Sequence, residues 1–365
     1  MDSIAFARGV PAPEMLPVRM IEAASQAALQ HDATRILSYG PGGGYGPLRE
    51  QLAEIHGVRP SQVLATTGSL HGFALFVEHL AQSLPSESRL AFVENPTYDR
   101  PLIVLERNGY RVRAIDTDAH GVLPDQLEAA LKQERPAVIY LIPSFQNPSG
   151  ATLSEDRRSQ VLDLAARYDV PIFEDDPYGQ LHFDTPAPTT LFAREHAAEV
   201  IYANSYSKTI SPGLRVGYLV LPESRAASLE QYANDTYISP TLLGQAVVSN
   251  IISGNALPNH LASLRTQLSK RSNIMCDAVD RLLPAATYTR PTGGYFLWVN
   301  LPDALETREL LVRSSELGAT FVAGDSFGPH NASSLRLAFS SPKISEITLG
   351  IERIASATSL LVPSS

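Results

Sequence analysis

Short apolar runs alternate with longer amphipathic segments along the middle of the chain, and this alternation constrains the fold most strongly. The runs are residues 63–65, 90–93, 137–142, 171–173, 200–202 and 216–221. Apolar residues at helical spacing lie between several of them, at 69–83, 125–133 and 154–168. Strands that are buried on both faces and separated by helices are typical of a largely parallel α/β sheet. We therefore predict an α/β protein.

The chain is longer than one hydrophobic core usually supports, because it has 365 residues. We place a large domain at 40–255. The pattern then changes to a long helical stretch, 259–283, followed by short strands and helices, which predicts a smaller α+β domain at 256–365. Residues 1–39 read as an irregular arm and a helix at 19–31, and we expect this segment to pack with the small domain.

Composition excludes several classes of function. The 29 basic and 38 acidic residues leave a net charge of −9, which argues against a nucleic-acid partner, because phosphate binding needs a basic face. The sequence has no run of about eighteen apolar residues that would span a bilayer. Its start lacks the layout of a signal peptide. The single cysteine, Cys276, allows no internal disulfide and favours a reducing compartment. We expect a cytoplasmic protein with no membrane partner.

Lys208 lies in the most informative segment, 205–215, between two predicted buried strands and among serines and a threonine. A buried lysine loses basicity and becomes nucleophilic, which suits Schiff-base formation. Ser205, Ser207 and Arg215 are suitable donors to a phosphate dianion. The alternative is a surface loop that happens to contain a lysine and an arginine.

Three acids, Glu174, Asp175 and Asp176, directly follow a predicted strand and precede Tyr178. Ligands of parallel α/β sheets bind at the carboxyl ends of strands. Acids at such a place can bind a metal, act as bases or hold a cationic ring nitrogen; the alternative is a solvated turn. Because no histidine or cysteine cluster with metal-ligand spacing accompanies them, we predict no metal site.

Two further loops follow predicted strands. Residues 143–150 contain Asn147 and turn-forming pairs, which a tight loop alone would explain. Residues 66–69 join a strand to a helix through Gly68, a geometry that presents backbone N–H groups and a helix N-terminus to an anion. Each loop by itself is weak evidence of a site.

Together, the order of these four segments resembles that of the class I and II aminotransferases, the fold-type I enzymes that use pyridoxal 5′-phosphate (PLP). Within them it is similar to the branch that contains 2-aminoadipate aminotransferase and the aminotransferase half of MocR-type regulators. The resembling segments are 6–11, 39–49, 94–98, 144–150, 174–178, 205–215, 293–298 and 335–337. The resemblance implies a large domain with a mostly parallel, seven-stranded sheet flanked by helices, plus a smaller α+β C-terminal domain.

The resemblance implies three catalytic residues. Lys208 would form the internal aldimine with PLP and, once released by substrate, act as general acid and base. Asp175 would keep the pyridine nitrogen of PLP protonated. Tyr178 and Asn147 would donate hydrogen bonds to the phenolic oxygen.

The same resemblance implies the other contacts. Ser69, Ser205 and Arg215 would hold the phosphate, and Tyr98 would stack on the ring. Tyr39 would reach the phosphate of a neighbouring subunit, which implies a homodimer with shared sites. The residues implied to bind the cofactor are Tyr39, Gly68, Ser69, Leu70, Tyr98, Asn147, Asp175, Tyr178, Ser205, Ser207, Lys208 and Arg215. Those implied to bind substrate are Gly9, Asn147 and Arg336, with Arg336 as the clamp for the α-carboxylate.

The chain departs from the family pattern in two places. It has Leu70 and His71 where the branch often has two glutamines. It has Arg8 where a glycine usually precedes Gly9. Arg8 either contacts a substrate side chain or points to water, and Arg19 is a similar case. The resemblance therefore does not extend to substrate choice.

We expect an aminotransferase with a ping-pong mechanism, in which an L-α-amino acid gives its amino group to PLP and a 2-oxo acid then accepts it. The donor could be aromatic, aliphatic or dicarboxylic. One alternative is another PLP reaction, either β-elimination or decarboxylation-coupled deamination. The other is a non-catalytic PLP-binding protein. Because the sequence starts at the aminotransferase arm, we do not expect a direct transcription factor.

Overall fold

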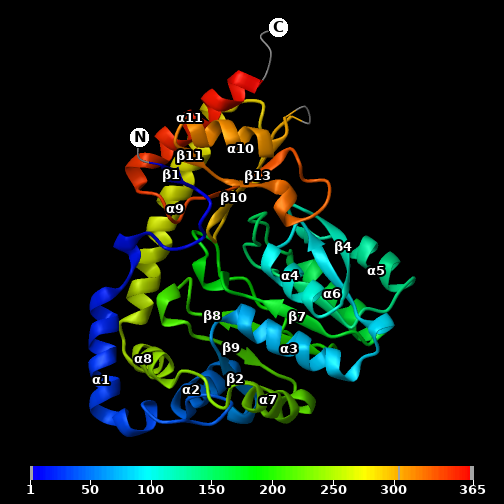
Figure 1. Cartoon of the computed structure of the whole chain (residues 1–365), viewed down its shortest axis with the longest axis vertical. Helices are drawn as coiled ribbons and strands as arrows, with labels where there is room; N and C mark the ends of the chain where they lie inside the picture. The colour runs from blue at the N-terminus through cyan, green and yellow to red at the C-terminus, as the bar shows by residue number, and fades with distance from the viewer. Residues whose placement is uncertain (1–2, 303–304, 362–365) are drawn as a thin grey trace.

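The computed structural model describes residues 3–302 and 305–361. Met1 and Asp2 of the expected arm, with 303–304 and 362–365, lie outside the described residues. The fold has a large α/β part and a smaller part above it, and the long helix α9 (Leu257–Leu282) runs from one to the other (Figure 1).

An eight-stranded sheet forms the centre of the large part, in the order β2-β9-β8-β7-β6-β3-β4-β5. Its strands are β2 (Val63–Thr66), β3 (Leu90–Asn95), β4 (Arg111–Asp118), β5 (Gly121–Val122), β6 (Val138–Leu141), β7 (Ile172–Asp175), β8 (Val200–Ser205) and β9 (Gly217–Val220). β9 runs antiparallel to both neighbours and β5 antiparallel to β4, whereas the other pairs are parallel. The sheet is thus mostly parallel, as predicted.

The sheet has one strand more than the seven expected, and its β4 matches none of the apolar runs in the sequence. β4 begins with Arg111, Val112 and Arg113, and most of its residues are at least partly exposed. It lies toward the edge of the sheet and pairs with the two-residue β5. Because its side chains are not buried on both faces, its sequence lacks the continuous hydrophobicity of the central strands.

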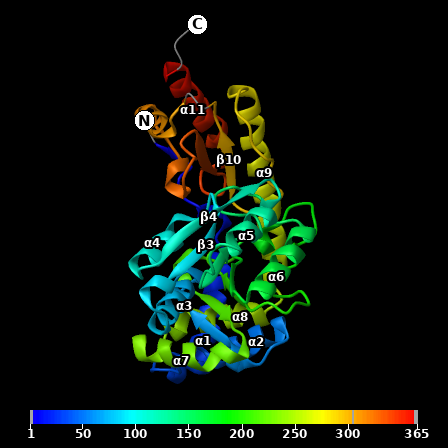
Figure 2. The same ribbon diagram turned by 90° about the vertical axis from the view of Figure 1, so that its right-hand side faces the viewer.

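Helices cover both faces of this sheet. They are α2 (Gly46–His56), α3 (Ser69–Ser83), α4 (Asp99–Arg107), α5 (Pro124–Leu131), α6 (Glu155–Tyr168), α7 (Glu223–Tyr237) and α8 (Leu242–Ser253). Phe73 of α3 packs on Tyr140 and Phe173, whereas α5 and α6 pack on the opposite face with Ile139 and Ile172. Figure 2 shows α3 and α4 on one side of β3 and β4, and α5 and α6 on the other.

The smaller part contains the antiparallel sheet β10 (Phe296–Asn300), β13 (Ser334–Ala338) and β12 (Val322–Ala323), in that order. Two helices, α10 (Thr307–Glu316) and α11 (Ile347–Leu361), pack with it. The arm joins this part through β1 (Ile4–Ala5), which pairs in parallel with β11 (Ala319–Thr320).

We expected the whole 1–39 segment to pack with the small domain. Helix α1 (Val18–Ile36), which forms most of this segment, packs elsewhere. It lies against α8, and its buried Ala24, Ala28 and Ile36 share a hydrophobic cluster with Leu48 and Val247 of the large part. The small alanines on this face let the two helices approach closely. The boundaries after 39 and 255 remain predictions.

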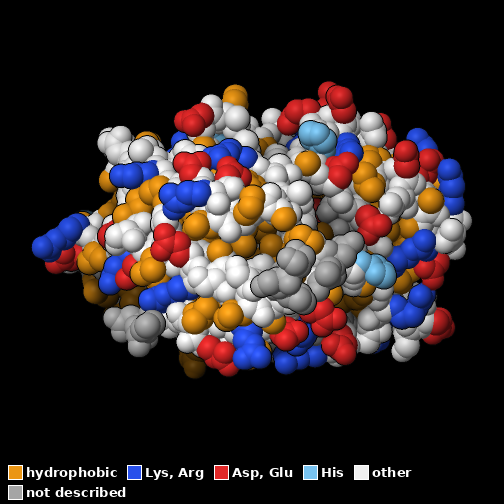
Figure 3. All heavy atoms as spheres, turned by 90° about the horizontal axis from the view of Figure 1, so that it is seen from above, with side chains coloured by type: hydrophobic (Ala, Val, Ile, Leu, Met, Phe, Trp, Pro, Cys, Tyr) orange, Lys and Arg blue, Asp and Glu red, His pale blue; other side chains and the backbone are white. Residues whose placement is uncertain are grey.

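One face of the molecule carries mixed charge (Figure 3). On the face seen from above, basic and acidic side chains are interspersed and no continuous basic area is present among the residues drawn in colour (Figure 3). Within 3–302 and 305–361, no helix is both long and apolar enough to cross a bilayer.

Replacing Phe6 tests whether the arm is part of the core. Its ring is fully buried, its backbone bonds to Thr320 and Ala338, and it packs beside Gly350 of α11. We expect Phe6→Ala to lower the free energy of unfolding by about 3–5 kcal/mol, measured by urea titration. Val312→Ala, at an exposed position of α10, is the control and should change it by less than about 0.5 kcal/mol. Equal stability of the two variants would contradict a structural role for the arm.

Candidate active site

A cavity of about 580 Å³ lies where the carboxyl ends of the central strands face the arm and the small sheet. Its lining contains every residue predicted for the site except Tyr39, namely Gly9, Gly68, Ser69, Leu70, Tyr98, Asn147, Asp175, Tyr178, Ser205, Ser207, Lys208, Arg215 and Arg336. Tyr39 lies outside this lining and is 85% exposed. The structure thus brings together residues from both parts of the chain.

Lys208 follows β8, and its amine lies inside this cavity. Nζ donates a hydrogen bond of 2.6 Å to the carbonyl oxygen of Gly9, and the Lys208 carbonyl accepts one of 2.6 Å from the Tyr295 hydroxyl. Burial lowers the pKa of the amine to about 8; the positive charges of Arg336 and Arg215 also lower it, and Asp175 opposes them. Far more of the neutral, nucleophilic amine is therefore present near neutral pH than in a free lysine.

Asp175, at the end of β7, contributes a buried carboxylate to the lining of the same cavity. Its Oδ2 accepts a 2.7 Å hydrogen bond from the Tyr140 hydroxyl, while its buried Oδ1 has no hydrogen-bond partner among the described residues. Burial raises the pKa of Asp175 to about 6, and hydrogen bonding by Tyr140 and Ser69 and the charge of Lys208 limit this rise. A buried acceptor without a partner is costly, so a cationic N–H donor would stabilise this oxygen.

The junction of β2 and α3 forms an anion cradle. Gly68 has a φ of +106°, and a Cβ atom there would lie 2.7 Å from Nη2 of Arg215. Gly217 is equally constrained, because its Cβ would lie 2.7 Å from the backbone of Gly68. Arg215 donates to Thr67 O at 2.6 Å and to Ser207 Oγ at 3.3 Å. These hydrogen bonds hold a cation beside the positive N-terminal end of α3, which favours a phosphate.

Arg336 lies in the middle of β13 and is only 7% exposed. Nη1 donates to Asn147 Oδ1 at 2.8 Å, and Nη2 donates to Ala7 O at 2.7 Å. The guanidinium carbon lies 4.3 Å from the ring centre of Phe296 and 4.9 Å from that of Phe327. Burial lowers its pKa from the ordinary value. The group is held rigidly, as recognition of a planar carboxylate requires.

Two tyrosines complete the aromatic wall. Tyr178 is buried, and desolvation raises its pKa well above the ordinary value, so its hydroxyl remains a donor. Tyr98, at the start of α4, is partly buried, and burial raises its pKa to about 12. Both hydroxyls are therefore protonated across the physiological range.

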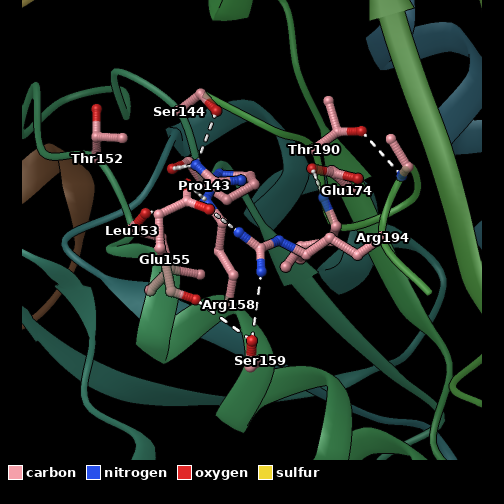
Figure 4. A network of polar contacts seen from close by, with 12 residues as sticks. Pro143, Ser144, Thr152, Leu153, Glu155, Arg158, Ser159, Glu174, Thr190 and Arg194 are labelled. Carbon is pink, nitrogen blue, oxygen red and sulfur yellow. Dashed lines mark hydrogen bonds and ion pairs between the residues drawn. The ribbon is translucent and has the colours of Figure 1, made fainter. Parts of the chain in front are cut away.

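The loop that carries Asn147 is clamped from two sides. Arg158 of α6, fully buried, donates to Leu153 O at 2.9 Å, Pro143 O at 2.7 Å and Ser144 Oγ at 3.0 Å (Figure 4). On the other side, Glu94 Oε2 accepts a 2.8 Å bond from the Ile142 N–H. These contacts fix the backbone before and after Asn147.

Sequence reasoning missed several of these supporting residues. Tyr140, Phe296 and Phe327 read as core aromatics, and nothing in the sequence marks them as neighbours of Asp175 or Arg336. Tyr295 and Phe296 lie within a segment of the family pattern, 293–298, which is the one signal that points to them.

The structure distinguishes the three residues whose roles the sequence left open. Arg19 is on the exposed face of α1, pairs with Glu22 at 2.9 Å and does not line the cavity. The ring of His71 accepts a 3.2 Å bond from the Thr67 N–H and so supports the β2–α3 loop. Arg8 lines the cavity and is an exposed residue.

Across 3–302 and 305–361, no three His, Cys, Asp or Glu residues are grouped to hold a metal ion. The cavity instead offers four features that fit PLP: a desolvated amine, an unpaired carboxylate oxygen on Asp175, an anion cradle and a cavity of suitable size. The amine suits the aldehyde of PLP, the carboxylate suits its pyridine nitrogen, and the cradle suits its phosphate. Fold and site together define the class of fold-type I PLP enzymes.

Comparison with known proteins identifies the family. The profile of the family "Aminotransferase class I and II" matches residues 5–354. The chain belongs to this family and is a PLP-dependent aminotransferase.

Relatives with similar sequences and structures agree with this assignment. The chain is 33% identical to the 2-aminoadipate transaminase of Thermus thermophilus over 97% of this chain and 89% of that one. It is 29% identical to an uncharacterised HTH-type transcriptional regulator of Bacillus subtilis, over 100% of this chain and 75% of that one. The crystal structure of Pyrococcus horikoshii kynurenine aminotransferase in complex with PMP matches with a TM-score of 0.93 and 29% identity, over 100% of this chain and 92% of that one.

We expect Arg158→Met to lower the free energy of unfolding by about 3–5 kcal/mol, measured by urea titration. The substitution leaves buried carbonyl oxygens unpaired and removes the positive charge that offsets buried Glu174 and Asp176. Arg157→Met is the matched control, because the neighbouring Arg157 is partly exposed, pairs with the more exposed Asp118 and donates to Gly121 O, and it should cost less, about 1 kcal/mol. A larger loss for Arg157→Met than for Arg158→Met would contradict the clamp.

Proposed function

We propose that this protein transfers the amino group of an L-α-amino acid to a 2-oxo acid by a ping-pong mechanism, with Lys208 as the group that forms the covalent link and moves the proton. The observation that carries this proposal is the joint placement of Lys208 and Arg336. Their side chains enter one cavity, and each bonds to a carbonyl of the same short arm segment, Gly9 O and Ala7 O. A single amino acid could therefore present its amine to one and its carboxylate to the other.

PLP, when bound, supplies the electron sink that stabilises negative charge developing at the substrate α-carbon. The Asp175 carboxylate would accept a hydrogen bond from the ring nitrogen and keep it protonated. Tyr178 and Asn147 would donate hydrogen bonds to the phenolic oxygen, and Tyr98 would pack on the ring. Ser69, Ser205, Ser207 and Arg215, with the backbone at Gly68 and Leu70, would hold the phosphate.

The chain's own side chains perform the remaining tasks. Arg336 holds the substrate α-carboxylate in a bidentate pair, with Asn147 beside it. The amine of Lys208 would remove the proton from the substrate α-carbon and later give it back, and its lowered pKa suits both roles. Phe296 and Phe327 exclude water around the clamp. Donor and acceptor share an α-carboxylate, so the same residues serve both half-reactions.

The proposal includes a homodimer and a cytoplasmic location. The 85% exposure of Tyr39 supports the dimer, because an exposed aromatic ring outside the cavity is available to a second subunit. Arg215 is also exposed at the phosphate end of the cavity. The single, buried cysteine supports a reducing compartment.

We expect Lys208→Ala to abolish transamination while some PLP still binds without a covalent link. The variant removes the nucleophile but leaves Asp175 and the phosphate cradle in place. The measurement is the change in cofactor absorbance when amino acids are added without a 2-oxo acid, followed by assay of the 2-oxo product. Lys132→Ala, at an exposed lysine, is the control and should behave like the wild type. Wild-type turnover by Lys208→Ala would refute the mechanism, and release of ammonia by the wild type would indicate a lyase.

The pH dependence of cofactor loading tests the environment of Lys208. Only the neutral amine attacks the aldehyde, and the pKa of Lys208 is lowered to about 8. We expect the rate of covalent attachment of PLP to the cofactor-free protein to rise about tenfold per pH unit below pH 8 and to level off above it. This rate would be measured from the change in cofactor absorbance in a stopped-flow instrument. A midpoint near the ordinary value of 10.5 would show that the amine is solvated.

A further inference from the structure

The arm places Arg8 between two reactive side chains. Ala7 O accepts a hydrogen bond from Arg336, and Gly9 O accepts one from Lys208, so the residues on either side of Arg8 are both fixed at the cavity. A Cβ atom at Gly9 would lie 2.4 Å from the ring of Phe296, which shows how closely the arm backbone packs against the cavity wall. The position of Arg8 is therefore set by the active site itself.

Arg8 is the unpaired cation of the lining. The residue lines the cavity and is exposed, and its guanidinium has no hydrogen-bond or ion-pair partner among the described residues. The other arginines of the lining are engaged: Arg100 lies 3.6 Å from Asp99, and Arg215 and Arg336 make the contacts given above. An unpaired guanidinium at a cavity is available to an anion from solution.

The chemistry of an amino acid decides which part of the substrate meets Arg8. The α-carbon carries an amine, a carboxylate, a hydrogen and a side chain. Lys208 takes the amine and Arg336 takes the carboxylate, so the side chain must occupy the remaining volume of the cavity. The charged groups left in that lining are Arg8 and the Arg100–Asp99 pair. Of these, Arg8 is the one that forms no ion pair with any acid in 3–302 and 305–361.

We propose that the preferred substrates are dicarboxylic, and that Arg8 binds the second carboxylate, the one on the substrate side chain. The class includes amino acids with an acidic side chain and the 2-oxo acids of the same carbon skeleton. A planar guanidinium and a carboxylate form two parallel hydrogen bonds, which gives direction as well as charge. This inference rests on the proposed function, because it uses Lys208 and Arg336 to orient the substrate.

Half-reaction kinetics of three variants test the proposal. Each holoenzyme is mixed with L-glutamate or L-glutamine, and with L-2-aminoadipate or L-norleucine, and the cofactor absorbance is followed. The wild type should prefer the acid of each pair. Arg8→Gln should lower the specificity constant for the acids about tenfold or more and change that for the neutral partners less than twofold. Arg8→Lys should retain part of the preference for acids, because lysine keeps the positive charge but cannot form the two parallel hydrogen bonds of a guanidinium.

Arg19→Gln is the matched control, because it removes one positive charge from the same N-terminal region at an exposed residue outside the cavity lining. It should leave both specificity constants unchanged. Binding of glutarate and of valerate to the holoenzyme, read from the shift of the cofactor spectrum, gives a second measurement without turnover. Glutarate should bind the wild type about tenfold more tightly than Arg8→Gln, and valerate equally well to both.

The outcomes separate the two proposals. If no amino acid changes the cofactor absorbance, the proposed function fails. If amino acids react but the wild type shows no preference for the acid of each pair, the inference fails and the proposed function stands. If Arg8→Gln lowers the specificity constants for the acids and for the neutral amino acids equally, the inference also fails. Arg8 would then affect catalysis only by supporting the conformation of the arm. Should Arg8→Gln not fold, the wild-type preference and Arg8→Lys decide the question.

Discussion

The site depends on removing one amine, that of Lys208, from water. Desolvation disfavours its charged form, and two arginines of the same cavity add to this effect, so the pKa falls to about 8. The carbonyl of Gly9 gives the amine a partner at 2.6 Å without adding a negative charge. That carbonyl belongs to the arm, and β1 fastens the arm to β11 of the small part. The nucleophile in the large part therefore owes its environment to residues about two hundred positions away.

The sequence predicted the large sheet, and which residues converge on the cavity, for one physical reason. Strands buried on both faces are continuous apolar runs, and the residues that follow them lie at one edge when the strands are parallel. Lys208 follows β8 and Asp175 ends β7, while the loop after β6 carries Asn147 and the β2–α3 junction carries Gly68. Their convergence at one cavity follows from this topology. Family resemblance added the contacts that topology alone does not give, such as Arg336 in the middle of β13.

The sequence could not predict features that depend on which neighbour a side chain meets. β4 was not recognisable, because an exposed strand rich in charge lacks an apolar run. Arg157 and Arg158 are adjacent in α6 and chemically identical, yet Arg157 is partly exposed and pairs with Asp118, whereas Arg158 is fully buried against the loop of Asn147. Helical spacing places the two side chains about 100° apart around the helix axis, but it does not say which of them faces the protein interior. Tyr140 similarly reads as a core residue, although its hydroxyl orients Asp175.

The arm separates two requirements that an active site usually has to meet with the same residues. Its main chain holds Arg336 and Lys208 through the carbonyls of Ala7 and Gly9, and its packing relies on Phe6 and on the absent side chain of Gly9. The side chain at position 8 takes part in none of these contacts. A substitution there changes the charge presented to a substrate without altering the groups that bind the α-carboxylate or move the proton. This independence explains physically how an arginine can stand where the family usually has glycine, while the neighbouring glycine is kept.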